Sequence, residues 1–260
     1  MNYLRSLLVH FVTIALVLLF APIAIVTAPV RGGRTALWLG WLWSTIIMSV
    51  AGVRIQCEGE EHIRKDVPQV FVANHQGNFD IFVLARLLRH VNFRFLAKKE
   101  LFRIPIFGWA LHAAGFPRID RGNSARARGI MEDTERMILE REISIGAFPE
   151  GTRNTKKGFL PFKKGAFVMA IKLQIPVVPI VINGSRRVQF RRAFCIKPGV
   201  IRVTVLEPVS TDGRNYKDRN ALIEVIRERM LEKLDPEDQA EDGLQAEPAD
   251  PREKKERTAQ

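Results

Sequence analysis

QVFVANHQGNFDIFVLARLLRH, residues 69–90, decides the fold of this 260-residue chain. Its apolar opening, rich in Val and Phe, is typical of a strand buried on both faces. A polar loop at 74–80 follows, and residues 79–90 form the next predicted helix. Strand, loop and helix in this order are the first half of a βαβ unit, so the stretch predicts a parallel sheet whose strands are joined by helices.

The same alternation continues to residue 234. The predicted strands are 53–59, 69–74, 93–97, 143–149, 176–183 and 201–207. The predicted helices are 79–90, 106–114, 123–141, 163–174 and 216–234. We therefore expect the α/β fold class, with a single mostly parallel β-sheet covered by helices, and one α/β domain over residues 54–234.

Two uncharged apolar stretches, 11–30 and 36–53, precede this body. The first is long enough to cross a bilayer, which takes about 20 residues, and the second is at the lower limit. A cleaved signal peptide is the alternative, but its apolar region is usually only about 7–15 residues long. Residues 1–53 are thus predicted to form a hydrophobic two-helix membrane anchor, either a spanning hairpin or a shallow one bent at Pro22.

The charge is distributed unevenly. From Asp235 onward there are nine acidic and four basic residues, which give a formal charge of −5. Because the whole chain has a formal charge of +12, residues 1–234 carry +17. A basic body predicts an anionic partner: nucleic acid, an acidic bilayer or a phosphorylated substrate. Residues 235–260 combine low hydrophobicity with mixed charge, and we expect a disordered tail. Cys57 and Cys195 lack the spacing of a zinc site, so no metal is predicted.

Polar segments follow the predicted strands at their carboxyl ends, where ligands gather in an open α/β sheet. NHQGNFD (74–80) places His75 at a strand end and Asp80 near the start of the next helix. A carboxylate on one imidazole nitrogen would fix the tautomer and leave the other nitrogen facing a substrate. In a chain of this composition, a His followed by an Asp at the fifth position arises by chance about one time in five. A histidine at a strand end is also often structural, so the pair alone does not establish a catalytic role.

A second segment, FPEGTRN (148–154), joins a glycine to a hydroxyl and a guanidinium group. Backbone N–H groups near Gly151, together with Thr152 and Arg153, form a good receptor for a phosphate. Glu150 is expected to orient the turn or the arginine. A capped turn with a solvated arginine is the alternative.

Further basic residues lie at other strand ends. Arg121 follows the short apolar stretch GFPRI, and Lys98 and Lys99 follow the strand predicted at 93–97. A solvated surface would explain any one of them. Because they recur at successive strand ends, we expect them to converge on one anion-binding site at that edge of the sheet.

Four segments together resemble a known family. NHQGNFD, AKKELFRIPIFGWALHAAGFPRIDR (97–121), FPEGTRN and IPVVPIVI (175–182) have the order and spacing of the four blocks of the glycerolipid acyltransferase family with the HxxxxD motif. The chain looks most like the lysophosphatidic acid acyltransferase branch. The resemblance implies that His75 and Asp80 are catalytic. It implies substrate binding by Lys98, Arg121, Glu150, Gly151, Thr152 and Arg153.

The resemblance also implies a reaction. A fatty acyl group passes from an acyl thioester, acyl-CoA or acyl carrier protein, to the free hydroxyl of lysophosphatidic acid, giving phosphatidic acid. His75 is expected to act directly as general base, because the motif positions no Ser or Cys as a nucleophile. Gly77, Phe79 and Arg118 depart from the family pattern, which leaves glycerol-3-phosphate, another lysophospholipid or a lyso-aminolipid open as acceptors.

Partners and location follow from the same reading. We expect membrane lipids, lysophosphatidic acid and the acyl donor as partners, no cofactor and no nucleic acid. The enzyme is expected on the inner (cytoplasmic) membrane, with its catalytic domain on the cytoplasmic side. Residues 104–116 are either the lining of a groove for one acyl chain or an ordinary buried helix. A nucleic-acid-binding protein, a membrane hydrolase and a silent scaffold are the rival functions.

Overall fold

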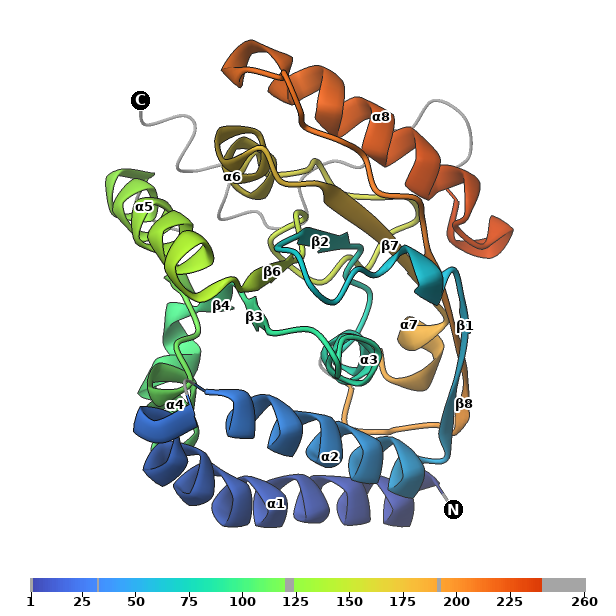
Figure 1. Ribbon diagram of the computed structural model, residues 1–260. Coiled ribbons are helices and arrows are strands. Elements are labelled where there is room, and N and C mark those ends of the chain that lie inside the picture. The colour runs from blue at the N-terminus through green and yellow to red at the C-terminus, as the bar shows by residue number, and fades with distance from the viewer. Residues whose placement is uncertain (1, 32, 120–123, 191–192, 240–260) are drawn as a thin grey trace, which may run out of the picture.

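The computed structural model describes residues 2–31, 33–119, 124–190 and 193–239 (Figure 1). Helices and strands alternate along the body, and a mostly parallel sheet lies at its centre. The predicted α/β class is therefore confirmed.

The main sheet has six strands in the order β1-β8-β7-β2-β6-β3. Their bounds are Val53–Glu58 (β1), Val70–Ala73 (β2), Phe93–Phe95 (β3), Ser144–Ala147 (β6), Val177–Asn183 (β7) and Gly199–Val205 (β8). β7 and β8 are antiparallel, and the other neighbours are parallel. The expectation of a single sheet is wrong in one detail: β4 (Ala97–Lys98) and β5 (Arg118–Ile119) pair in a separate two-stranded sheet.

β2 lies in the middle of the sheet, and all four of its residues are buried. Phe71 and Ala73 pack on one side, in a core shared with α2 (Arg34–Ala51) and α3 (Phe79–Leu87). Val70 and Val72 pack on the other side, against α6 (Gly165–Leu173) and α8 (Arg219–Glu232). Because successive strand residues point to opposite faces, a continuous apolar run fills both cores.

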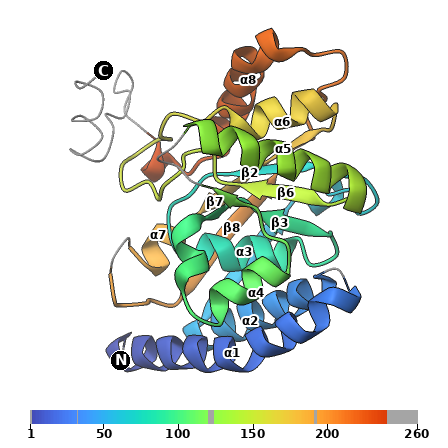
Figure 2. The ribbon, with the colours of Figure 1, turned by 90° about the vertical axis from the view of Figure 1, so that its left-hand side faces the viewer.

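The remaining helices surround this sheet. They are α1 (Asn2–Arg31), α4 (Phe107–Ala113), α5 (Ser124–Arg141), α7 (Ser185–Val188) and the short 3₁₀ turns Glu60–His62, Lys99–Arg103, Tyr216–Asp218 and Pro236–Asp238. Figures 1 and 2 show α1 and α2 lying together along one end of the molecule, with α8 at the opposite end.

The N-terminal helices differ in character. By its length and composition, α1 qualifies as a membrane span, and within the described ranges it is the one helix that does. The predicted two-helix anchor is thus supported for α1, whereas α2 places Ile47 and Met48 in the main core. α1 is also packed on the body: the Ser6 hydroxyl accepts a hydrogen bond from the Ile196 N–H at 2.8 Å, and His10 stacks on Phe194 at 4.8 Å.

The described chain continues five residues beyond the predicted start of the tail. Asp235 accepts hydrogen bonds from Arg187 and Arg202, at 2.9 and 2.7 Å, and half-buried Gln239 donates to the Leu234 carbonyl. The boundary placed at Asp235 is therefore too early, and residues 235–239 are part of the body. Residues 240–260 of the predicted tail lie outside the described residues.

Candidate active site

The loop after β2 carries the first candidate residues. Asn74, buried at the end of the strand, donates to the Ile182 carbonyl and accepts from the Ile182 N–H, at 2.9 and 2.7 Å. The amide side chain thus continues the pairing of β2 with β7 by one residue. Its neighbour His75 leaves the sheet at a fixed point, next to the end of β6, where Val72 pairs with Ala147.

His75 and Asp80 lie together as predicted from their spacing. The His75 Nδ1 is 2.7 Å from the Asp80 Oδ2, and Asp80 is fully buried at the start of α3. The same oxygen accepts the backbone N–H groups of Gln76 and Gly77, at 2.7 and 2.8 Å. Because an ionised carboxylate only accepts, Nδ1 carries the proton in this pair and Nε2 is left as the basic nitrogen.

An aromatic ring covers one face of the histidine. Phe148, which directly follows β6, stacks on His75 with ring centroids 4.1 Å apart and an interplanar angle of 18°. The histidine side chain keeps 14% of its surface exposed. The ring is thus held from one edge and one face, and it retains limited access to its surroundings.

Glu150 ties the second loop to the first. One carboxylate oxygen accepts the His75 backbone N–H at 2.8 Å, and the other accepts the Leu160 N–H at 2.9 Å. Glu150 is 4% exposed, and burial raises its pKa to about 7. Both oxygens are engaged by protein donors, so the geometry gives Glu150 a positioning contact with the main chain and not an open ligand position.

The next residues of the 148–154 loop are Gly151, Thr152 and Arg153. Gly151 has a φ of 73°, a conformation that favours glycine, and the flexible end of the Lys163 side chain lies 2.7 Å from the position that a Cβ would take. Thr152 is half-buried beside it. The Arg153 guanidinium donates to the Asn78 side chain, in the loop between His75 and Asp80. The structure therefore brings Arg153 to the histidine loop.

The other predicted cations are placed differently. Lys98 lies in β4, where its ammonium is 3.7 Å from the Glu100 carboxylate and both side chains are about half exposed. Such a pair is worth little in water. Arg121 lies outside the described residues.

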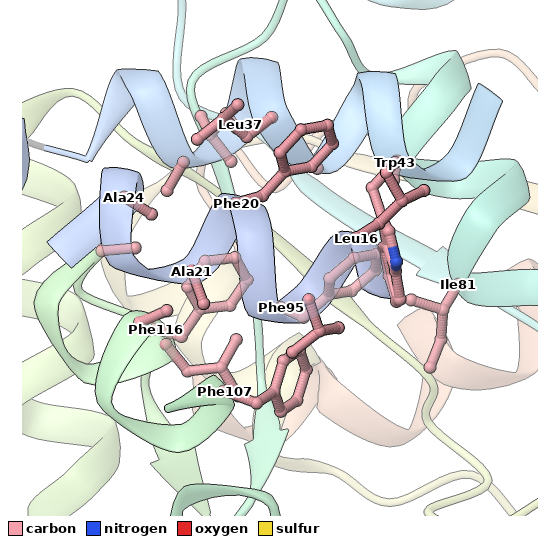
Figure 3. A pocket seen from close by; sticks show the side chains of 18 of the residues that line it. Leu16, Phe20, Ala21, Ala24, Leu37, Trp43, Ile81, Phe95, Phe107 and Phe116 are labelled. Atoms are coloured by element: carbon pink, nitrogen blue, oxygen red, sulfur yellow. The ribbon is translucent and has the colours of Figure 1, made fainter. Parts of the chain in front are cut away.

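An apolar cavity of about 160 Å³ lies between α1, α2, α3, α4 and β3 (Figure 3). Phe107, Ala110 and Phe116, from the stretch predicted either to line a groove or to be buried, contribute to its wall. Phe95 also points into it, and its ring stacks on Phe148 at 6.1 Å. Stacked rings therefore lead from the cavity wall to His75.

Some site residues escaped the sequence analysis. Gln76 donates to the Asp238 carboxylate at 3.1 Å, and the Gly158 N–H donates to the Asp238 carbonyl at 2.6 Å. Asp238 is also 3.5 Å from Arg186. Its position in an acidic segment read as a tail gave no signal of this contact. Lys163 had a signal, the Lys-Lys pair at a helix start, but its contact with Gly151 depends on the fold.

Fold and site together define a class of protein: an α/β protein with a histidine hydrogen-bonded to a buried carboxylate at the carboxyl end of a central strand, where such sheets bind their ligands. A triad nucleophile of the serine or cysteine type is not part of the 74–80 and 148–154 loops.

Comparison with known proteins identifies the family. A family model described as Acyltransferase matches residues 54–183. A 1-acyl-sn-glycerol-3-phosphate acyltransferase alpha from Mus musculus is 36% identical over 184 residues, and one from Homo sapiens is 33% identical over 218. The aligned regions are 69% and 83% of this chain, and 63% and 76% of the mouse and human proteins. The chain belongs to the acyltransferase family.

Further relatives agree with this assignment. A 1-acyl-sn-glycerol-3-phosphate acyltransferase from Limnanthes douglasii is 31% identical over 75% of this chain and 68% of that protein. The crystal structure of the 1-acyl-sn-glycerophosphate (LPA) acyltransferase PlsC from Thermotoga maritima has the same fold, with a TM-score of 0.75 at 23% identity, covering 89% of this chain and 95% of that one. The resemblance predicted from the four sequence blocks is thus confirmed, and the chain is an acyltransferase.

Proposed function

We propose that this enzyme transfers a fatty acyl group from an acyl thioester to the free hydroxyl of lysophosphatidic acid, giving phosphatidic acid. The observation that carries the proposal is the His75–Asp80 pair, 2.7 Å apart beside the arginine-bearing loop 148–154. The names of the relatives support the choice of acceptor.

The histidine acts as general base. Nε2 of His75 removes the proton from the acceptor hydroxyl while that oxygen attacks the thioester carbonyl carbon. The tetrahedral oxyanion collapses, the C–S bond breaks, and the thiolate leaves and takes up the proton held by the imidazolium. A thiol pKa near 8.5 makes the thiolate a good leaving group. Asp80 orients the ring and stabilises its charged form, and base catalysis of this kind is worth about 10²–10⁴-fold.

The acceptor phosphate is held by the second loop. Arg153 presents a guanidinium fork next to the histidine loop, and the exposed ammonium side chain of Lys163 lies against Gly151. A guanidinium group binds phosphate oxygens in a two-pronged geometry, and an ammonium group adds a point charge. Arg121 and Lys98 remain proposed ligands on the basis of the family motif. Glu150 is assigned to positioning.

The cavity under β3 takes one acyl chain. An open pocket with an almost wholly apolar lining favours an apolar ligand, because binding removes apolar surface from water. Phe95, in the cavity wall, is joined through Phe148 to His75 by ring stacking, so a chain in the cavity has its carbonyl end directed toward the base.

The enzyme meets the membrane through α1. The outer side of this helix exposes a run of large apolar side chains: Leu4, Leu7, Leu8, Phe11, Ile14, Leu18, Leu19, Ile23, Val26 and Val30. Spacings of three and four residues place them along one face. The opposite side of α1 packs on the body and lines the cavity. A helix held in this way lies along the bilayer surface, and we place the body on the cytoplasmic side.

An acceptor panel tests the function. The full chain in mixed detergent–lipid micelles receives labelled acyl-CoA or acyl carrier protein with lysophosphatidic acid, glycerol-3-phosphate, lysophosphatidylcholine or no acceptor. We expect phosphatidic acid to be the main product, and His75→Ala to lose it while still binding vesicles. Free fatty acid released without an acceptor would establish a hydrolase instead. Preference for another acceptor would overturn the assignment to lysophosphatidic acid.

Arg153 provides a second test. Arg153→Ala should raise the KM for lysophosphatidic acid at least tenfold, because a charge-assisted bidentate contact is lost. Arg64→Ala, at an exposed position before β2, is the matched control. A change confined to the KM of the acyl donor would contradict the proposed phosphate contact.

A further inference from the structure

Away from the histidine, a second pocket opens where α1 turns into α2. It has a volume of about 570 Å³ and is lined by Arg31 at the end of α1, Arg34 at the start of α2, Asn92 before β3 and Arg141 at the end of α5. These four residues are brought together from four separate segments. In Figure 2 the α1–α2 turn lies below the C-terminal end of α5.

The pocket is strongly cationic. Among the described residues, no carboxylate forms an ion pair with Arg31, Arg34 or Arg141, and all three are exposed. Three guanidinium groups around one cavity repel one another unless an anion lies between them. The site is therefore suited to a multiply charged oxyanion, which guanidinium groups bind by paired hydrogen bonds.

A fourth arginine lies behind this pocket. Arg94 is 2% exposed and donates to the Ala114 carbonyl at 2.6 Å, and its guanidinium would lie 2.7 Å from a Cβ at Gly33 in the turn. Burial, together with the positive charges of Arg141 and Arg34, lowers the pKa of Arg94 to about 10. Arg34 and Arg141, which both line the pocket, therefore act electrostatically on the same buried cation, Arg94.

The position of the pocket indicates the source of the anion. The exposed apolar face of α1 ends at Val26 and Val30, and Arg31 follows at once. On a helix that lies in the membrane interface, the residues just beyond the apolar face are level with the lipid headgroups. The apolar cavity and the arginine pocket also adjoin, since Ala24 and Ala114 line the first while Ala28 and Ala113 line the second.

We propose that Arg31, Arg34 and Arg141 form a binding site for the phosphate group of an anionic membrane lipid, separate from the acceptor phosphate site beside His75. The bound headgroup fixes the α1–α2 turn at the bilayer surface and neutralises the cluster. This site does not depend on which acceptor the enzyme uses.

Vesicle binding by the full chain tests the site. Binding is compared between phosphatidylcholine vesicles and vesicles that also contain about one-fifth phosphatidylglycerol, for wild type and for R34Q/R141Q. A basic residue near an anionic surface contributes about 1 kcal/mol, so the loss of two should weaken binding to the anionic vesicles roughly 30-fold. Binding to phosphatidylcholine alone should be little changed, and R34K/R141K should restore most of the anionic preference.

The control removes the same charge elsewhere. Arg227 and Arg229 lie on α8, at the opposite end of the molecule from α1, and R227Q/R229Q should alter binding less than about threefold. Equal losses in the two double variants would show a diffuse charge effect and would overturn the site. Should R34Q/R141Q fail to fold, R31Q carries the same comparison, with an expected loss of about fivefold.

Inorganic phosphate distinguishes the two sources of the ligand. The midpoint of thermal unfolding is measured in neutral detergent with and without phosphate at matched ionic strength. If the site binds a lipid, added phosphate should change the unfolding midpoints of wild type and R34Q/R141Q equally. If phosphate alone stabilises wild type but not the variant, and vesicle binding is the same for both, the pocket is a site for the free ion and the lipid proposal is wrong.

Discussion

The Glu150 carboxylate accepts the backbone N–H of His75 at 2.8 Å, so an acidic residue of the second loop holds the main chain that carries the proposed base. Its other oxygen holds Leu160 in the same way. Glu150→Gln replaces one acceptor oxygen with an amide donor, which then faces an N–H group. We expect kcat to fall at least tenfold with a smaller change in the KM for the acceptor, measured by steady-state acyl transfer.

A contact between Glu150 and the substrate predicts a different outcome. Loss of a phosphate ligand would raise the KM for lysophosphatidic acid and leave kcat nearly unchanged. Glu61→Gln, at an exposed glutamate, is the control and should change neither parameter.

The same carboxyl group makes stability depend on pH. Burial raises the pKa of Glu150 from 4.5 to about 7, so the folded protein binds this proton more tightly than the unfolded chain does. The contribution of the group to stability is therefore present at low pH and is lost as the pH rises from about 4.5 to 7, by up to about 3 kcal/mol. Thermal midpoints of wild type, relative to Glu150→Gln, should decrease across this range. Parallel curves for the two proteins would contradict the prediction.

Asp80 should be needed for the chemistry and less for the fold. Asp80→Asn keeps the shape of the side chain, but it removes the charge that stabilises the imidazolium and permits the wrong histidine tautomer. We expect kcat to fall by about 10²–10⁴-fold while vesicle binding is unchanged. A variant that retains more than a tenth of the wild-type kcat would show that the pair is structural.

Asp238 should support the histidine loop from the C-terminal segment. Its carboxylate accepts from Gln76 at 3.1 Å, and the Gln76 N–H donates to Asp80. Asp238→Ala leaves the buried Gln76 amide without this partner, so the free energy of unfolding should fall by about 1–3 kcal/mol and kcat should fall several-fold. Asp212→Ala, at an exposed aspartate, should change stability by less than about 0.5 kcal/mol. If Asp238→Ala and Asp212→Ala had equal effects, Asp238 would not stabilise the histidine loop.

The cavity should set the preferred length of the acyl chain. Ala110 lines it, and Ala110→Phe fills part of the space without adding a polar group. We expect kcat/KM to fall about tenfold for long-chain donors and little for short-chain donors, in a series of acyl thioesters. Trp109→Phe, on the exposed side of the same helix, is the control. A uniform fall for all chain lengths would place the acyl chain elsewhere.

The sequence by itself determined the class of fold and the contact between His75 and Asp80, the proposed catalytic pair. Continuous apolar runs such as Val70–Ala73 can be satisfied only by burial on both faces, so they predict a parallel sheet, and a loop of four residues between His75 and Asp80 lets them meet at a helix start. These features depend on local spacing, which is written directly in the chain.

Only the tertiary structure decided which distant residues support that pair. The bonds from Glu150 to His75 and from Asp238 to Gln76 span 75 and 162 positions, and the meeting of Arg34 with Arg141 depends on how α1, α2 and α5 pack. No local pattern encodes such contacts, because they follow from strand order: β2 and β6 are neighbours in the sheet although α3, β3, β4, α4, β5 and α5 lie between them in the sequence. The antiparallel direction of β8 and the packing of residues 235–239 on the body could not be predicted from the sequence for the same reason.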